Sequence, residues 1–159
     1  MKRKMLSTQV VAAALIGMIS APVLHAADEA FNASIRIVAA LAISETSALT
    51  FPQTEASTST QQVAIGPNDS GAASFNITGE PNAGVTASIV EPSLEMTVGQ
   101  TTITINTFTF GGALASNGSV SLNGSGSATG AKVGATANIP ANPESGQYSG
   151  ALTFRVVYN

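Results

Sequence analysis

The chain ends in the stretch Leu152-Thr153-Phe154-Arg155-Val156-Val157-Tyr158-Asn159, in which every second residue up to Tyr158 is large and apolar. Successive side chains of a β-strand point to opposite faces, so this alternation predicts a strand with one face in a core and the other in solvent. The same period of two recurs in Phe31–Ile43, Ala73–Ile77, Val85–Ile89, Leu94–Val98, Val120–Leu122 and Val133–Ile139.

Turn-forming residues separate these runs at short intervals. They include Gly66-Pro67-Asn68-Asp69, Gly79-Glu80-Pro81-Asn82, Asn117-Gly118 and Asn123-Gly124. Many short strands with turns between them predict an all-β domain, either a β-sandwich or a barrel. Between Ile105 and Phe108 the apolar residues change from odd to even positions. This change predicts either a β-bulge near Asn106 or Thr107 or two strands that meet at a loop.

The N-terminus has the organisation of a secretory signal peptide. Three basic residues, Lys2-Arg3-Lys4, precede an apolar run from Val10 to Ile19, and the stretch that follows ends in the small residues Ala26-Ala27. The run is too short to cross a bilayer, which needs about 20 apolar residues. We therefore predict a signal peptide over residues 1–26, cut after Ala26 or after Ala27. The rest would be exported through the periplasm to the cell surface or the extracellular space, with no membrane span after signal removal.

Charge and composition exclude several classes of function. The segment after residue 26 has 133 residues, enough for one domain, and keeps three basic residues against nine acidic ones. This balance argues against nucleic acid as a partner. The only histidine, His25, lies in the predicted signal peptide, and the chain has no cysteine. Imidazole and thiolate chemistry are therefore absent from the released protein, and we expect no enzyme activity, no cofactor and no metal.

The C-terminal stretch resembles that of pilins of the bacterial chaperone-usher pathway. Counted from the C-terminus, Tyr158 is second, Val156, Phe154 and Leu152 follow at every second position, and Gly146 is fourteenth. The resemblance implies an immunoglobulin-like β-sandwich that lacks one strand, with an apolar groove that a periplasmic chaperone fills by strand addition. Groove and chaperone contacts would come from Gly146, Leu152, Phe154, Val156, Tyr158 and, through its carboxylate, Asn159. A plain last strand of a complete sandwich would show the same alternation.

The N-terminal apolar run is longer than an ordinary strand. Phe31–Ile43 spans 13 residues, whereas strands commonly have five or six. In pilins the early part of such a run is a donor strand that enters the groove of the preceding subunit. The resemblance therefore implies a donor-type strand over residues 27–39, followed by a β-sandwich domain over residues 40–159. The donor side chains would be Phe31, Ala33, Ile35, Ile37 and Ala39.

The stretches from Phe31 to Phe51 and from Phe75 to Pro81 also resemble the domain-of-unknown-function 4402 family. That resemblance covers nearly all of the released chain and implies a fold and an exported setting, but little function. Our expectation is an exported structural subunit of a pilus or fimbria that polymerises by donor-strand exchange. Its partners would be copies of itself, a periplasmic chaperone and an outer-membrane usher. The alternative is a self-complete secreted β-sandwich, a monomeric binding or matrix protein in which Phe31–Ile43 pairs within its own sheet.

Overall fold

The computed structural model describes residues 27–159, so the predicted signal peptide lies outside the described residues. These residues belong to two units, residues 27–35 and residues 36–159, and each is described by itself. All regular structure in the described residues is β-strand, which confirms the all-β prediction. No helix within this part of the chain is long and apolar enough to cross a membrane.

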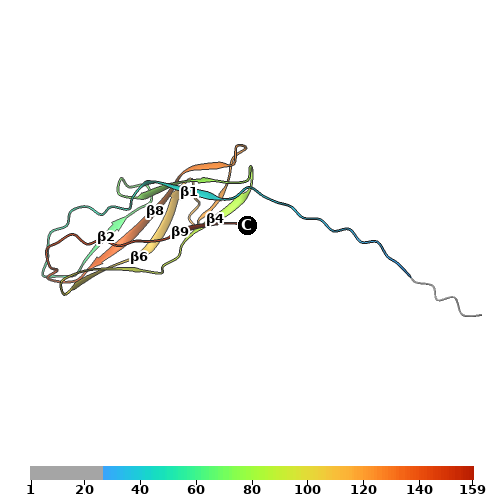
Figure 1. Cartoon of the computed structure of the whole chain (residues 1–159). Helices are drawn as coiled ribbons and strands as arrows, with labels where there is room; N and C mark the ends of the chain where they lie inside the picture. The colour runs from blue at the N-terminus through green and yellow to red at the C-terminus, as the bar shows by residue number, and fades with distance from the viewer. Residues whose placement is uncertain (1–26) are drawn as a thin grey trace, which may run out of the picture. The chain divides into compact units, whose positions relative to one another are not determined.

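Two sheets face each other as a β-sandwich (Figure 1). The larger sheet has the order β1-β3-β8-β6-β5, with β2 also paired to β8, and the smaller sheet has the order β7-β4-β9. The strands are β1 (Ala42–Ser47), β2 (Gln61–Ile65), β3 (Ala73–Thr78), β4 (Gly84–Ile89), β5 (Leu94–Val98), β6 (Thr101–Gly112), β7 (Ser119–Ser121), β8 (Ser127–Ile139) and β9 (Phe154–Tyr158).

Strand β8 is the centre of the larger sheet. Its 13 residues pair antiparallel with β6 and, one after the other, with β3 and β2. The β3 pairing covers the first part of β8, with Ala73 opposite Val133, and the β2 pairing covers the last part, with Gln61 opposite Ile139. The larger sheet is therefore continuous along the whole length of β8.

The change of apolar phase in residues 103–110 is a β-bulge inside one strand. β6 continues from Thr101 to Gly112, and its pairing with β8 shifts between Asn106 and Thr109. Thr107, inside this shift, has a φ of 53°. The bulge prediction is confirmed and the loop alternative is wrong. The extra residue lets the apolar side chains on both sides of the shift face the interior.

The core consists of two clusters that differ in what covers them. The first cluster lies between the two sheets and includes Ile77 of β3 with Val85 and Val156 of the smaller sheet. In the second cluster all the buried residues belong to β6 and β8 of the larger sheet: Ile103, Ile105, Ala135, Ala137 and Ile139. Among the described residues, the smaller sheet thus contributes buried side chains to the first cluster only.

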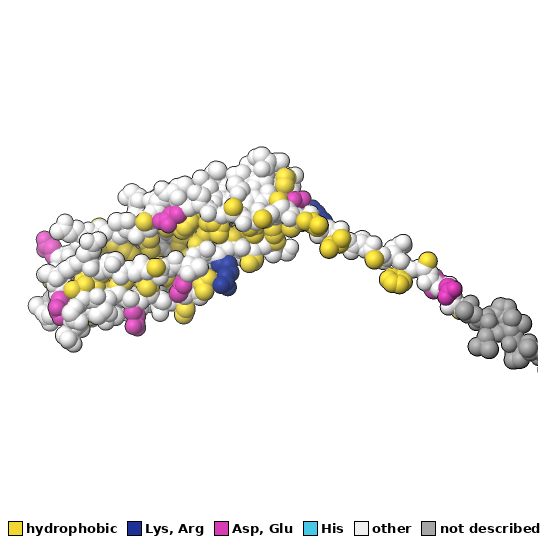
Figure 2. Space-filling model, viewed as in Figure 1, with side chains coloured by type: hydrophobic (Ala, Val, Ile, Leu, Met, Phe, Trp, Pro, Cys, Tyr) yellow, Lys and Arg dark blue, Asp and Glu magenta, His cyan; other side chains and the backbone are white. Residues whose placement is uncertain are grey.

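The predicted inward faces agree with this core, except in the N-terminal run. Ile77 and Val85 are fully buried, as the alternation predicted. Within Phe31–Ile43, only the last two residues, Ala42 and Ile43, lie in a strand. Phe31, Ile35 and Ile37 are 89%, 89% and 87% exposed. Figure 2 shows hydrophobic side chains along the N-terminal segment. Residues 27–41 are not part of a strand in the described structure.

Candidate functional site

A long apolar groove lies over the second cluster, where the smaller sheet does not reach. Its volume is about 1320 Å³, and its floor includes Val63, Ile103, Ile105, Ala137 and Ile139 of the larger sheet. A band of hydrophobic side chains is visible along the body in Figure 2. Such a continuous apolar surface is typical of a site for another apolar element.

Two irregular segments form the walls of the groove. One wall is residues 48–56, which follow β1, and the other is residues 143–152, which precede β9. Leu49 and Phe51 from the first wall and Tyr148 from the second pack against the second cluster. These three side chains cover part of the cluster in place of a strand.

The wall segments carry backbone groups that no other backbone group satisfies. Residues 145–152 form no backbone-to-backbone hydrogen bond within residues 27–159, and the same holds for residues 51–56. The second wall is held at its ends, where Glu144 N–H donates to Thr101 Oγ1 and Thr153 N–H donates to Glu91 Oε2. Unpaired backbone beside an apolar floor is the arrangement that accepts an added β-strand.

Two glycines let the second wall pass close to β5. A Cβ atom at Gly146 would lie 2.9 Å from Val98 Cγ1, and one at Gly150 would lie 2.9 Å from the Leu94 side chain. A larger residue at either position would displace the facing side chain of β5 or the wall segment itself. The predicted site residue Gly146 therefore has a packing role in the groove wall, which its spacing from the C-terminus did not indicate.

The predicted C-terminal residues divide between the groove and the first cluster. Gly146, Leu152 and Phe154 line the groove. Val156 is buried in the first cluster, and Tyr158 packs against that cluster. Asn159 lies beside β4, where its N–H donates to Gly84 O and its Oδ1 accepts from Thr86 Oγ1. The C-terminal strand thus connects the groove with the opposite half of the domain.

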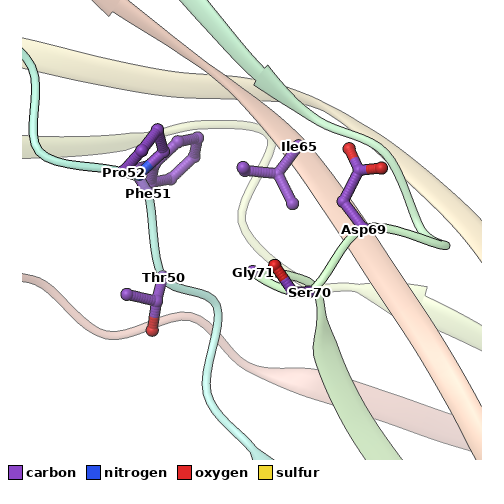
Figure 3. Close-up of a pocket in the computed structure, with 7 residues that line it drawn as sticks. All are labelled: Thr50, Phe51, Pro52, Ile65, Asp69, Ser70 and Gly71. Atoms are coloured by element: carbon purple, nitrogen blue, oxygen red, sulfur yellow. The ribbon is translucent and has the colours of Figure 1, made fainter.

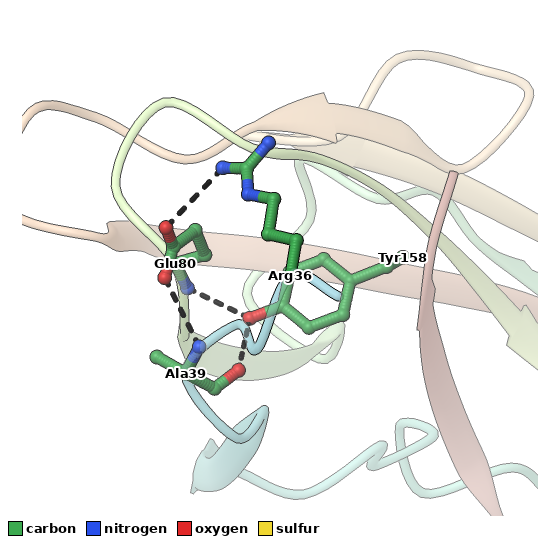
Figure 4. A network of polar contacts seen from close by, with 4 residues as sticks. All are labelled: Arg36, Ala39, Glu80 and Tyr158. Atoms are coloured by element: carbon green, nitrogen blue, oxygen red, sulfur yellow. Dashed lines mark hydrogen bonds and ion pairs between the residues drawn. The ribbon is translucent and has the colours of Figure 1, made fainter. Parts of the chain in front are cut away.

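Of the predicted donor residues, Ala39 alone makes described polar contacts, and these involve Tyr158 and Glu80 (Figure 4). Ala39 N–H donates to Glu80 Oε2 over 3.0 Å, and Tyr158 Oη donates to Ala39 O over 2.6 Å. The same hydroxyl accepts a hydrogen bond of 2.7 Å from Glu80 N–H. Arg36 adds an ion pair with Glu80 at 3.4 Å. We call Arg36, Ala39, Glu80 and Tyr158 the clamp.

The clamp depends on close packing around the tyrosine hydroxyl. A Cβ atom at Gly79 would lie 2.5 Å from Tyr158 Oη and 2.8 Å from Leu41 Cδ2, so a larger residue there would displace one of these side chains. The hydrogen bond from Ala39 N–H, followed by the contact with Arg36, lowers the pKa of the Glu80 carboxyl below its ordinary value of 4.5. Glu80 is therefore ionised at neutral pH and bound to the segment that leads into β1.

A smaller hollow of about 540 Å³ borders the first wall (Figure 3). It shares Thr50, Phe51 and Pro52 with the groove and is completed by Ile65 and residues 69–71. Its one charged side chain, Asp69, accepts the hydrogen bond of Gly66 N–H through Oδ2. That carboxylate stabilises the turn between β2 and β3.

The chemistry available to the groove is recognition of an apolar, extended segment. Within the described residues no group of three or more His, Cys, Asp or Glu side chains is placed to hold a metal ion. The acidic residues Glu80 and Glu91 both accept backbone hydrogen bonds and act as structural acceptors. Hydrogen bonds from Thr153 lower the pKa of the Glu91 carboxyl in the same way.

Several residues of the site were not indicated by the sequence pattern. The sequence pattern places Gly79 and Glu80 in a turn, and nothing in it indicates that residues 48–56 line a groove or that Glu80 accepts a hydrogen bond from Ala39. Position 80 meets position 39 only because β1 pairs with β3, with Ala42 opposite Thr78. That pairing could be inferred only from the topology.

One comparison with known proteins gives a match. The model of a family described as Domain of unknown function (DUF4402) matches residues 39–158. The search of curated proteins and the search of solved structures find no match. The matched region begins at the clamp residue Ala39 and ends at the clamp residue Tyr158.

Proposed function

Because the chain belongs to the family described as Domain of unknown function (DUF4402), whose description assigns no activity, we propose its function from the groove. We propose that the protein is an exported structural subunit of a surface fibre, and that the N-terminal segment of one copy fills the groove of the next. The observation that carries this proposal is the apolar groove left uncovered by the smaller sheet.

The groove suits an extended strand better than a small molecule. Its floor is apolar, while both walls offer backbone groups without backbone partners. A β-strand satisfies both features, because its backbone pairs with a wall and alternate side chains enter the apolar floor. Helices and compact ligands would leave the wall backbone unpaired.

The N-terminal segment has the properties of such a strand. Residues 27–40 form no strand, and the large alternating side chains Phe31, Ile35 and Ile37 are exposed. Burying each of these side chains would contribute about 1.5–3 kcal/mol before the cost of ordering. Residues 31–39, when extended, would span about 30 Å at 3.3 Å per residue. A segment of this kind is a plausible donor for the groove of a second copy.

The remaining parts of the proposal concern the setting of the protein. Export depends on the signal peptide predicted at residues 1–26. A periplasmic chaperone and an outer-membrane usher are proposed partners, since an empty groove with an unpaired edge invites aggregation during export. The proposed role is structural rather than catalytic.

Electrophoresis of surface material with and without boiling tests the proposal. We expect a ladder of multimers in the unboiled sample and a single band after boiling. Replacing Phe31 and Ile35 by serine should abolish the ladder, because both side chains belong to the apolar face of the donor. The matched control replaces Asn32 by serine and Ser34 by threonine, on the opposite face of the same segment, and should keep it.

A monomer in both samples of the wild-type protein would overturn the proposal. That outcome would favour the monomeric binding or matrix protein instead. An unchanged ladder in the Phe31→Ser, Ile35→Ser variant would show that multimers form without the donor segment.

A further inference from the structure

We propose that residues 36–41, which we call the root, keep the N-terminal segment out of the groove of its own domain. Because the root and the clamp would prevent self-insertion, the groove would be filled by the N-terminal segment of a second copy. Glu80 and Tyr158 would position the root. This inference rests on the proposed function, because it concerns whether the N-terminal segment enters the groove of its own domain or the groove of a second copy.

The topology allows self-insertion only through a reversal of the chain. After the root comes β1, whose Glu45 lines the groove, and β1 leads directly into residues 48–56, which line it too. A segment that precedes the root could enter this groove only by turning back and running antiparallel to β1. A two-residue turn at Ala39–Ala40 would place residue 31 opposite residue 48. The segment is therefore long enough to reach the groove of its own domain. Whether it does so depends on whether the chain can form this turn.

The root lacks the residues that such a turn requires. Tight hairpin turns need positive φ at one or both central residues and are dominated by Gly, Asn and Asp. The root reads Arg36-Ile37-Val38-Ala39-Ala40-Leu41 and contains none of these, and it has no proline. Ile37 and Val38 are β-branched, for which positive φ is a strong outlier. The local sequence therefore favours an extended root.

The clamp opposes the same reversal by a second means. Both backbone polar groups of Ala39 are already bonded, the N–H to Glu80 Oε2 and the carbonyl to Tyr158 Oη. A turn centred on Ala39 and Ala40 would change the direction of these groups and break both hydrogen bonds. The clamp is anchored in the body, because Tyr158 packs against the first cluster and also binds Glu80 N–H.

A variant that supplies the missing turn tests the inference. Ala39→Asn with Ala40→Gly introduces the preferred hairpin pair, and Ala39→Ser with Ala40→Ser is the matched control. Size-exclusion chromatography measures the multimer fraction, and amide hydrogen exchange measures protection of residues 31–37 in the monomer. We expect the turn variant to lose multimers by about tenfold, a shift of about 1.4 kcal/mol. Its monomer should protect residues 31–37, while the wild type and the control leave them unprotected.

The outcomes separate this inference from the proposed function. If the wild type forms multimers and the turn variant does the same with an unprotected monomer, the inference is overturned and the proposed function stands. If the wild-type monomer already protects residues 31–37, the inference is also overturned. If the wild type forms no multimers but the turn variant protects residues 31–37, the inference is supported and the fibre proposal fails.

The clamp is tested by a second pair of variants. Glu80→Gln combined with Tyr158→Phe weakens its hydrogen bonds without a large change of shape. We expect this double variant to shift material from multimers to self-protected monomers. Glu95→Gln, at an exposed position of β5, is the control and should leave this ratio unchanged. If the double variant has the same ratio of multimers to self-protected monomers as the wild type, Glu80 and Tyr158 do not help to prevent self-insertion.

Discussion

Glu80 links the ionisation of one carboxyl group to the hydrogen bonding of the root at Ala39. Its side chain is 26% exposed and accepts the Ala39 N–H, and its pKa is lowered from the ordinary value of 4.5. The folded protein thus binds this proton less readily than the unfolded chain. The stabilisation from Glu80 is present above about pH 4.5 and is lost as the pH falls through the lower, folded pKa.

Acidification should therefore release the root. We expect the exchange of the Ala39 amide proton, corrected for the intrinsic effect of pH, to accelerate in the wild type as the pH falls through the folded pKa of Glu80. NMR measurements of exchange at Ala39 would show this. Glu80→Gln should lack the pH-dependent acceleration, whereas Glu91→Gln, which removes a carboxylate bonded to Thr153, should keep it. An identical response in the Glu80→Gln variant would show that another group titrates.

Individual residues differed in how well the sequence predicted them. Ile77 and Val85 follow the period of two, and both are fully buried. Contacts between residues that are distant in the sequence could not be predicted in this way. Alternation shows only on which face of its strand a side chain lies. The tyrosine hydroxyl of Tyr158 is an example: its bond to Ala39 joins positions 119 residues apart.

Strand β9 connects the groove to the clamp. Its first residue, Phe154, anchors the strand to the larger sheet. The ring of Phe154 stacks on Phe75 of β3, with centroids 4.2 Å apart and an angle of 6° between the ring planes. It also lines the groove, while Val156 and Tyr158 further along the strand belong to the other half of the domain. The stack thus joins the two sheets at the border between the covered and uncovered halves.

Truncating this ring should lower stability in proportion to its partial burial. Phe154→Ala should cost about 2–3 kcal/mol, below the 3–5 kcal/mol of a fully buried phenylalanine. Val157→Ala, on the outward face of the same strand and 50% exposed, should change stability by less than about 0.5 kcal/mol. Urea unfolding followed by circular dichroism measures both values. Equal effects of the two substitutions would contradict the assigned inward face.

At the scale of elements, the sequence predicted strands well and strand ends less well. The alternation at Leu152–Tyr158 suggests one run, but the strand begins at Phe154. Residues 145–152 have no backbone partner within the described chain, and regular pairing cannot be assigned to them. The bulge in β6 was visible as a change of apolar phase because it alters the face that each side chain occupies.

For the whole molecule, the proposed filling of the groove by a second chain predicts that the donor segment stabilises the domain. A synthetic peptide of residues 27–39 should raise the free energy of unfolding by about 2.7 kcal/mol at 100 times its dissociation constant. Thermal unfolding at increasing peptide concentration would measure this effect. A peptide with Phe31 and Ile35 replaced by serine should have no effect at the same concentrations. Equal stabilisation by both peptides would show that binding does not use the apolar face.

The assembly of the two sheets could be predicted only in part. Alternation and turns indicate an all-β domain, and this is what the chain forms. The width of each sheet depends on long-range pairing, so the sequence pattern alone could not show that the smaller sheet has three strands. The groove follows from that difference in width, and the prediction of a missing strand came from the family resemblance.

The clamp has a mechanical consequence for a fibre under tension. A pull on the N-terminal segment reaches the domain at the root, and without other contacts it would act on β1 alone. Within residues 27–159, β1 is an edge strand with exposed side chains that pairs with β3 alone, so it could peel away one hydrogen bond at a time. The bonds from Ala39 to Glu80 and Tyr158 transfer part of the force to the β3–β4 turn and to β9. A pulled subunit of the proposed fibre would thus share the force between both sheets, and its resistance to stretching would depend on these two hydrogen bonds as well as on the β1–β3 ladder.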